Sequence, residues 1–313
     1  MQRKFKKILL VIRGREEEQA VIQRAARLAK QSGAKLTALR VLQRQLPDAH
    51  MESAWVPRKE IEKIAAALAH EDLRKVLRPV EKQSAAQVKV IWGTPFLEVI
   101  REVQRHRFDL VMVNAQAVGT LRGSLFGHMT MQLMRQCPCP VWAVKSGARA
   151  PANRVLAAIA APESAEAAKL NDKIVELASS VAQQEHSELH LVHAWDVFAE
   201  GILRGRAGVK DADLDAMTRQ ARLAGKKMLL DLDSRHGLSV PSERIHLVKG
   251  SAAAVIPRLA LRKKIDVLVM GTVCRTGVAG LLMGNTAERV LGNVKCSVLT
   301  LKPDRFVTPV RLK

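Results

Sequence analysis

The sequence contains no tyrosine, and aromatic residues make up only 3% of its 313 residues. Proteins that bind single-stranded nucleic acid use aromatic side chains as platforms on which bases stack. With 6 phenylalanines and 4 tryptophans, such platforms are scarce in this chain. Recognition of bases by stacking is therefore not expected.

Long hydrophobic runs are also missing. A helix needs about 20 consecutive apolar residues to cross a bilayer, and charged residues interrupt every apolar stretch well before that length. The basic N-terminus is followed by an apolar run over only residues 8–12, too short for the core of a signal peptide. We expect a cytoplasmic protein without membrane contact.

The four cysteines, Cys137, Cys139, Cys274 and Cys296, follow no zinc-binding spacing. A reducing compartment is the default for such a chain. The Cys137-Pro138-Cys139 segment lacks the C-x-x-C spacing of disulfide oxidoreductases. A core role is favoured for these thiols, and a redox role stays open.

Familiar catalytic motifs are absent as well. The sequence has no Gly-x-Ser-x-Gly elbow, no Walker-type Gly-Lys-Ser/Thr and no His-Glu-x-x-His. His186, His190 and His193 are close in sequence, but His190 and His193 should point to opposite faces of one strand. We expect no metal site and no enzymatic activity.

Acidic residues are fewer than basic residues. The chain carries 51 Lys and Arg against 30 Asp and Glu, a net charge of +21 and an isoelectric point near 10.4. Residues 1–150 hold 27 basic and 13 acidic residues, so this half is the more basic. Such a charge attracts polyanions, but it also serves solubility, and both interpretations remain open.

The most informative feature that is present is an internal repeat. Shifting the first half by 157 positions places Asn114 on Gly271, Ala117 on Cys274 and Gly127 on Gly284. One offset over such a span indicates one fold used twice. We place the two domains at residues 1–146 and 153–303, with the last dozen residues of the chain as a tail.

Both halves alternate buried strands with amphipathic helices, which predicts parallel sheets with helices on both faces. The strands are expected over 7–12, 36–42, 88–91, 110–113 and 141–144, then 154–160, 189–195, 245–248, 267–270 and 298–301. The longer helices are expected over 57–77, 165–182, 211–236 and 252–262, with a short one over 286–292.

In such sheets ligands bind at the carboxyl ends of strands where the strand order reverses. The loop from Gly271 to Thr286 leaves such an end and enters a helix, whose N-terminus suits phosphate. Asn285 is expected to cap this helix, with Glu288 completing a capping box. A well-capped helix after a glycine-rich turn is the alternative without a ligand.

Gly271-x-x-Cys274, nine residues, then Gly284-Asn285-Thr286 resembles the ATP-binding motif of universal stress proteins, Gly-x-x-Gly, nine residues, then Gly-Ser/Thr. Val192-His-Ala-Trp195 and Lys249-Gly250-Ser251 also resemble that family. The resemblance implies two tandem Rossmann-like (adenine nucleotide alpha hydrolase-like) α/β domains, each a five-stranded parallel sheet with helices on both faces. It also implies a stress role and pairing of the domains through their last strands, Val141–Lys145 and Val298–Lys302.

Departures from the family motif limit the function. Arg13 and Ala160 stand where nucleotide-binding members end the first strand with an Asp that contacts the nucleoside. The first half keeps only Gly127 of the motif, so its nucleotide site is expected to be lost. For the second half, the resemblance implies that any ATP, weakly bound or absent, contacts the residues Gly250, Gly271, Thr272, Gly284, Asn285 and Thr286.

Two function classes follow from these features. The first is a stress-response protein that senses a nucleotide or another anionic ligand through its second domain. The second is a scaffold or polyanion-binding protein with vestigial ligand sites. The expected partners are a second copy of the chain, an unidentified protein of a stress pathway, and nucleic acid through weak, salt-sensitive contacts.

The scattered basic residues generate a prediction about nucleic acid. We expect weak, sequence-independent DNA binding at low salt, because neutralising phosphates releases counterions. Binding should vanish at physiological salt, as measured by fluorescence anisotropy over a salt series. Sub-micromolar affinity retained at that salt would favour the scaffold or polyanion-binding class.

Overall fold

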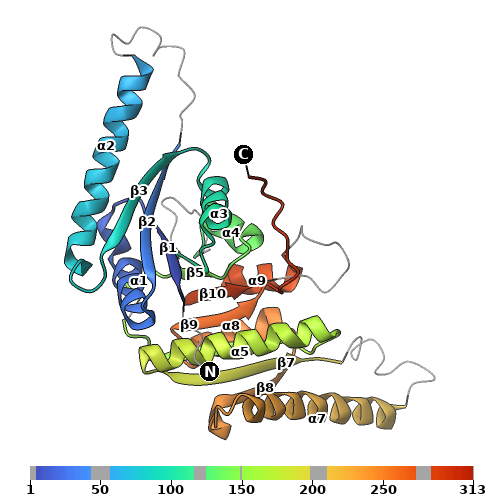
Figure 1. Cartoon of the computed structure of the whole chain (residues 1–313). Helices are drawn as coiled ribbons and strands as arrows, with labels where there is room; N and C mark the ends of the chain where they lie inside the picture. Colours follow the sequence, from blue (N-terminus) through green and yellow to red (C-terminus); the bar gives the residue numbers. More distant parts are fainter. Residues whose placement is uncertain are drawn as a thin grey trace. The chain divides into compact units, whose positions relative to one another are not determined.

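The computed structural model (Figure 1) describes residues 5–43, 57–115, 125–148, 150–197, 210–272 and 283–312. The chain forms two compact units. Described residues of the first unit lie within 4–150 and 305–312, and those of the second within 151–272 and 283–304. No described helix has both the length and the apolar character that a bilayer crossing requires.

The first unit is built on five parallel strands in the order β3-β2-β1-β4-β5. The strands are β1 (Lys7–Val11), β2 (Lys35–Leu42), β3 (Ala86–Trp92), β4 (Leu110–Asn114) and β5 (Val141–Val144). The helices are α1 (Gln19–Ser32), α2 (Arg58–Leu77), α3 (Pro95–His106) and α4 (His128–Gln136), with 3₁₀ turns η1 (Glu16–Glu18) and η3 (Arg78–Val80).

The second unit repeats this plan, with parallel strands in the order β10-β9-β6-β7-β8. Its strands are β6 (Arg154–Ile159), β7 (Glu188–Trp195), β8 (Ile245–Lys249), β9 (Val267–Gly271) and β10 (Ser297–Leu301). Its helices are α5 (Ala165–Glu185), α7 (Asp211–Arg235), α8 (Ala252–Arg262) and α9 (Asn285–Asn293), with the 3₁₀ turn η4 (Ser242–Arg244). The predicted fold class, tandem Rossmann-like domains with five-stranded parallel sheets, is confirmed.

The handedness of the crossovers distributes the helices over both faces of each sheet. Parallel crossovers are almost always right-handed, and the chain moves outward from β1 through β2 to β3 before returning through β4 to β5. The helices α1 and α2 therefore cover one face, while α3 and α4 pack together on the other. The same reversal in the second unit pairs α8 with α9.

The central strands are buried on both sides, as their continuous apolar runs predicted. Ile8, Leu9 and Leu10 on β1 are each 0% exposed. Side chains of one strand alternate between the two faces, so neighbouring residues are all buried only where helices cover both. This burial holds β1 and β4 in register and positions the loops that follow them.

The prediction of a C-terminal tail was wrong. Residues 305–312 pack within the first unit, where Val310 is 6% exposed. Arg101 Nε donates to the Arg311 carbonyl at 3.2 Å, and Gln104 Nε2 donates to the Val310 carbonyl at 3.2 Å. Both donors lie on α3, so a segment with no periodicity of its own is hydrogen-bonded to this helix.

Replacing Val310 by Asp should therefore destabilise the first unit. A buried, unpaired carboxylate costs about 2–4 kcal/mol of unfolding free energy, measured by urea denaturation of the full chain. Val307→Asp is the matched control, because Val307 is 72% exposed. Equal losses in the two variants would contradict the docking of this segment.

Candidate functional site

The loops of interest lie at the carboxyl ends of the strands where strand order reverses. In the first unit this point lies between β1 and β4, and in the second between β6 and β9. Adjacent crossovers leave such a point in opposite directions, which opens a crevice between their loops. Arg13 follows β1 and Ala160 follows β6 at these edges.

Most of the predicted site residues of the second unit lie together. Gly271 ends β9, Thr272 is 0% exposed, and the Gly284 N–H donates to the Thr272 carbonyl at 3.1 Å. Asn285 and Thr286 follow as the first two residues of α9, and both are exposed. Cys274 and the rest of the loop, residues 273–282, lie outside the described residues.

The predicted helix cap was wrong by one position. Gly284 is the N-cap residue of α9, with φ −64° and ψ 141°, and no side chain caps the helix there. Asn285 is already helical, so its side chain does not sit where an N-cap side chain accepts backbone N–H groups. The first N–H groups of α9 have no partner within the helix, as at every helix start.

The fold itself accounts for glycine at two of the candidate site positions. A Cβ on Gly271 would lie 2.9 Å from Leu170 Cδ2 of α5, closer than real Cβ contacts. Gly250 has φ +129° in the turn after β8, a conformation open to glycine and strained for other residues. Its N–H donates to the Trp195 carbonyl at 2.8 Å, so Gly250 is held beside the outer strands β7 and β8.

A buried lysine supports the start of this loop. Lys302, which directly follows β10 and is 8% exposed, donates from Nζ to Thr272 Oγ1. The contact places a positive charge directly behind the backbone that leads from β9 toward the loop. Charge of that sign favours an anion at this edge of the sheet.

A buried amide holds the backbone at Ala160, the position where the family resemblance leads one to expect an acidic residue. Asn171 on α5 is 4% exposed, and its Nδ2 donates to the Ala160 carbonyl at 2.7 Å. The backbone after β6 is thereby fixed without any charged side chain. The position offers no carboxylate to a ligand.

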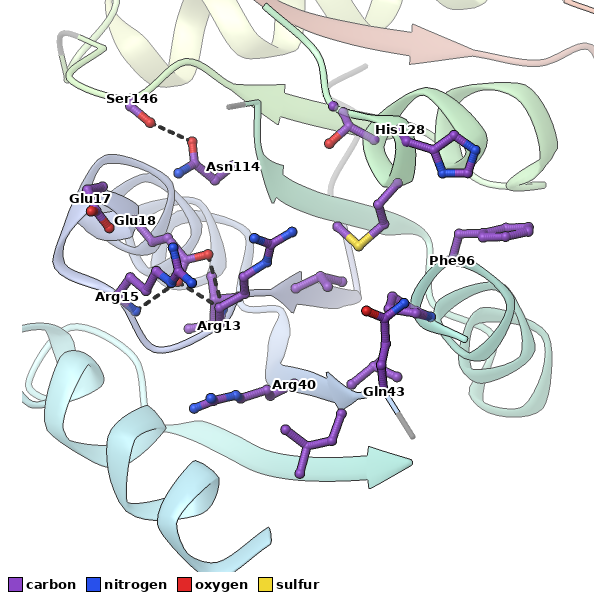
Figure 2. Close-up of a pocket in the computed structure, with 18 of the residues that line it drawn as sticks. Arg13, Arg15, Glu17, Glu18, Arg40, Gln43, Phe96, Asn114, His128 and Ser146 are labelled. Atoms are coloured by element: carbon purple, nitrogen blue, oxygen red, sulfur yellow. Dashed lines mark hydrogen bonds between the residues drawn. The ribbon is translucent and has the colours of Figure 1, made fainter. Parts of the chain in front are cut away.

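In the first unit, the same edge holds a cavity of about 1010 Å³ (Figure 2). Its lining comes from β1 and the loop after it, β2, the starts of α3 and α4, and the ends of β4 and β5. Sequence reasoning predicted that the nucleotide motif of this half is lost and noted Arg13 only as a departure. Loss of nucleotide binding stays a prediction, while the crevice itself is present.

Three arginines line this cavity: Arg13, Arg15 and Arg40 (Figure 2). The Glu18 carboxylate, 6% exposed, accepts the backbone N–H groups of Arg13 at 2.9 Å, Gly14 at 3.0 Å and Arg15 at 3.0 Å. Glu18 thus folds the loop back on itself and satisfies its amides. The arginine side chains of this loop remain at the cavity.

The other side of the cavity is formed by the start of α4. Gly127 is its N-cap residue, again without a capping side chain, and His128 is exposed as predicted. The His128 ring meets the Phe96 ring edge to face, with centroids 6.4 Å apart. The arginines and this helix start give the cavity groups that can bind an anion.

One signal in the sequence could have revealed this site. Arg13 lies two residues after the first strand, and Arg40 lies near the carboxyl end of the second. The carboxyl ends of adjacent parallel strands meet at one edge of a sheet. The positions of both arginines could be predicted from the sequence. The ion pair of Arg40 with Asp72 of α2, at 2.8 Å, is seen only in the folded chain.

The histidines of β7 have separate partners. His193 Nδ1 lies 3.0 Å from the Ile159 carbonyl, whereas His190 stacks on His246 of β8 with Nδ1 3.1 Å from its Nε2. Within the part of the chain that the structure describes, no three His, Cys, Asp or Glu side chains gather as a metal site. Burial and the neighbouring His190 lower the pKa of His246 to about 4.

Comparison with known proteins gives two matches to one family. The sequence profile of the universal stress protein family matches residues 4–145 and again residues 152–302. Universal stress protein E of Escherichia coli K12 is 30% identical over 324 residues, covering 98% of this chain and 97% of the relative. A homologue of that protein from Haemophilus influenzae is 26% identical and covers 96% and 99% of the two chains.

Solved structures agree over the same span. A functionally unknown protein from Pseudomonas aeruginosa PAO1 matches with a TM-score of 0.71 and 25% identity, covering 96% of this chain and 93% of that one. A universal stress protein from Archaeoglobus fulgidus matches with a TM-score of 0.64 at 19% identity, covering 95% and 98%. The second of these likenesses bears on the fold alone.

The depressed pKa of His246 generates a prediction about acid stability. An unfolded imidazole titrates near pH 6.5, so between pH 6.5 and about 4 the unfolded chain binds more protons than the folded one. The free energy of unfolding should therefore fall as pH drops through this window. His246→Gln should reduce the loss between pH 7 and pH 4.5 by about 1–2 kcal/mol, after allowance for partial exposure.

The measurement is urea denaturation of the parent and the variant at both pH values. His106→Gln is the control for an exposed imidazole, since the His106 side chain is 52% exposed on α3. The same pH dependence in His246→Gln as in the parent would contradict the assignment.

Proposed function

This chain belongs to the universal stress protein family, and on that premise we propose that it is a non-catalytic, cytoplasmic stress-response protein that binds an anionic ligand. The family match covers both halves, so the chain is a tandem of two such domains. The question is then which domain takes the ligand, and of what class.

One observation supports an anion as the class of ligand. At the carboxyl edge of each sheet, a nine-residue helix begins directly after a glycine N-cap that no side chain caps. The two glycines are Gly127 before α4 and Gly284 before α9. Unpaired N–H groups and the positive end of a helix dipole together suit phosphate or carboxylate.

The second unit is the proposed site for a nucleotide. Its phosphates would lie on the N–H groups at Gly284, Asn285 and Thr286, with Gly271 and Thr272 along the edge of the site, Lys302 behind them and Gly250 at the outer strands. Ala160 withholds the acid that contacts the nucleoside in other members. A charge-assisted hydrogen bond contributes about 1–3 kcal/mol, so ATP should bind roughly 5- to 150-fold more weakly than in a member with the full motif.

The cavity of the first unit is the second candidate. Arg13 stands where a nucleoside-binding acid is expected from the family motif, Arg15 adds further positive charge, and Arg40 lines the cavity while paired with Asp72. This lining supports an anion without a nucleoside, for example a polyphosphate or a multivalent carboxylate. It does not support adenine-nucleotide binding, which we propose for the second unit alone.

The alternative function is a scaffold or polyanion-binding protein with vestigial ligand sites. The net charge of +21 favours it, whereas the arrangement of the two helix starts favours a ligand. We also propose that the domains pair through their last strands. A homodimer and an unidentified partner protein of a stress pathway are further proposals.

Isothermal titration calorimetry with ATP tests the primary proposal. We expect weak binding by the full chain, at no more than one site. Gly284→Val should abolish it, because a branched side chain at the N-cap covers the first N–H groups of α9. Gly127→Val, the matched change at the start of α4, should leave ATP binding unaffected.

Tripolyphosphate titrated into the same variants separates the two candidate sites. Binding that is lost only in Gly127→Val would assign an anion without a nucleoside to the first unit. Two equivalent ATP molecules bound per chain would overturn the assignment to the second unit. Absence of any binding at millimolar concentrations would favour the scaffold alternative.

A further inference from the structure

Two thiols of the first unit lie in contact at the edge of the sheet remote from the ligand site. Cys137 is the C-cap residue of α4, and Cys139 stands just before β5, with Pro138 between them. Their Sγ atoms are 3.6 Å apart, and both cysteines are free. Disulfide sulfurs are separated by about 2.05 Å, so closure requires only a small movement.

The backbone holds the two thiols in this arrangement. The Cys137 N–H donates to the Leu133 carbonyl at 2.9 Å, and the Pro140 carbonyl accepts the Val111 N–H at 3.0 Å. Pro138 and Pro140 further restrict the chain on both sides of Cys139. Little conformational entropy remains to be lost when the two sulfurs join.

The repeat shows that the fold does not require this pair. In the second unit, Val294 is the C-cap residue of α9, at the position equivalent to Cys137, and it is 1% exposed. Cys296 is the residue equivalent to Cys139. An apolar side chain thus fills the equivalent buried position in the second unit. Packing alone therefore does not require a thiol at Cys137.

We propose that Cys137 and Cys139 form a redox-active dithiol, which a low-molecular-weight disulfide such as oxidised glutathione converts to an intramolecular disulfide. The partly exposed Cys139 is the point of entry, since Cys137 is 0% exposed. The Cys139 thiolate attacks one sulfur of glutathione disulfide, forming a mixed disulfide and releasing one glutathione. The Cys137 sulfur then attacks the Cys139 sulfur and releases the second glutathione. Two protein thiols are oxidised, and one external disulfide is reduced to two thiols.

The surroundings of Cys139 make this exchange slow at neutral pH. The hydrogen bond with Cys137 and burial raise the pKa of the Cys139 thiol well above its usual value. Because the thiolate is the nucleophile, the rate should rise about tenfold per pH unit between pH 7 and pH 9. A disulfide across one intervening residue closes a tight ring, so mild thiols should reduce it readily.

The test is peptide mapping of the full chain equilibrated in glutathione buffers and then trapped with N-ethylmaleimide. Cleavage after Arg135 and Lys145 releases one peptide with both cysteines. In oxidising buffer this peptide should escape alkylation and be lighter by two hydrogen atoms, and dithiothreitol should reverse the change. Cys139→Ser should abolish the product, whereas Cys296→Ser should leave it intact.

A second variant examines the order of steps. Cys137→Ser should retain glutathione on Cys139, because the resolving thiol is missing; circular dichroism checks that it folds. The mapping of the parent chain does not depend on any variant. The proposal is overturned by a lasting mixed disulfide in the parent, by a link from Cys139 to Cys274 or Cys296, by full alkylation in oxidising buffer, or by a rate independent of pH.

Discussion

Both units depend on one constraint, the pairing of parallel strands. Parallel neighbours need a crossover connection, and each crossover helix must cover a face of the sheet. The chain meets this requirement by building outward from β1 and then returning to its other side at β4, and from β6 to β9 in the second unit. The crevice follows from this reversal, whatever residues line it, which explains why the first unit retains a large cavity although its motif has diverged.

The same crevice has acquired different chemistry in the two units. In the first, the buried carboxylate of Glu18 holds the loop after β1, and arginines face the cavity. In the second, the neutral amide of Asn171 holds the backbone at Ala160. Each solution satisfies the backbone at the end of the first strand of its sheet. Position 13 is Arg and position 160 is Ala, so both units depart from the family motif at the same point.

Helix α4 connects the two features that distinguish the first unit. Its first residues, His128 to Thr130, line the cavity, and its C-cap residue is Cys137. The helix has nine residues and packs on α3. The thiol pair and the cavity therefore lie at opposite ends of one helix.

The sequence by itself determined the repeat, the alternation of strands and helices, and most element bounds. The helix α8 begins and ends where its pattern predicted, and α2 begins directly after Pro57. These features are local, because hydrophobic periodicity and helix-end residues act over a few positions. The grouping of Gly271, Thr272 and the start of α9 was also predictable, since a short motif encodes it.

Only the tertiary structure decided what depends on residues far apart in the chain. The side chain that crowds a Cβ at Gly271 belongs to Leu170 on another helix. The Val310 carbonyl accepts from Gln104 of α3, 206 residues earlier in the chain. Gly284, the N-cap residue of α9, donates its N–H to the Thr272 carbonyl at the end of another element. Such contacts leave no periodic trace in the sequence, because packing and long-range hydrogen bonds arise only after the elements have assembled.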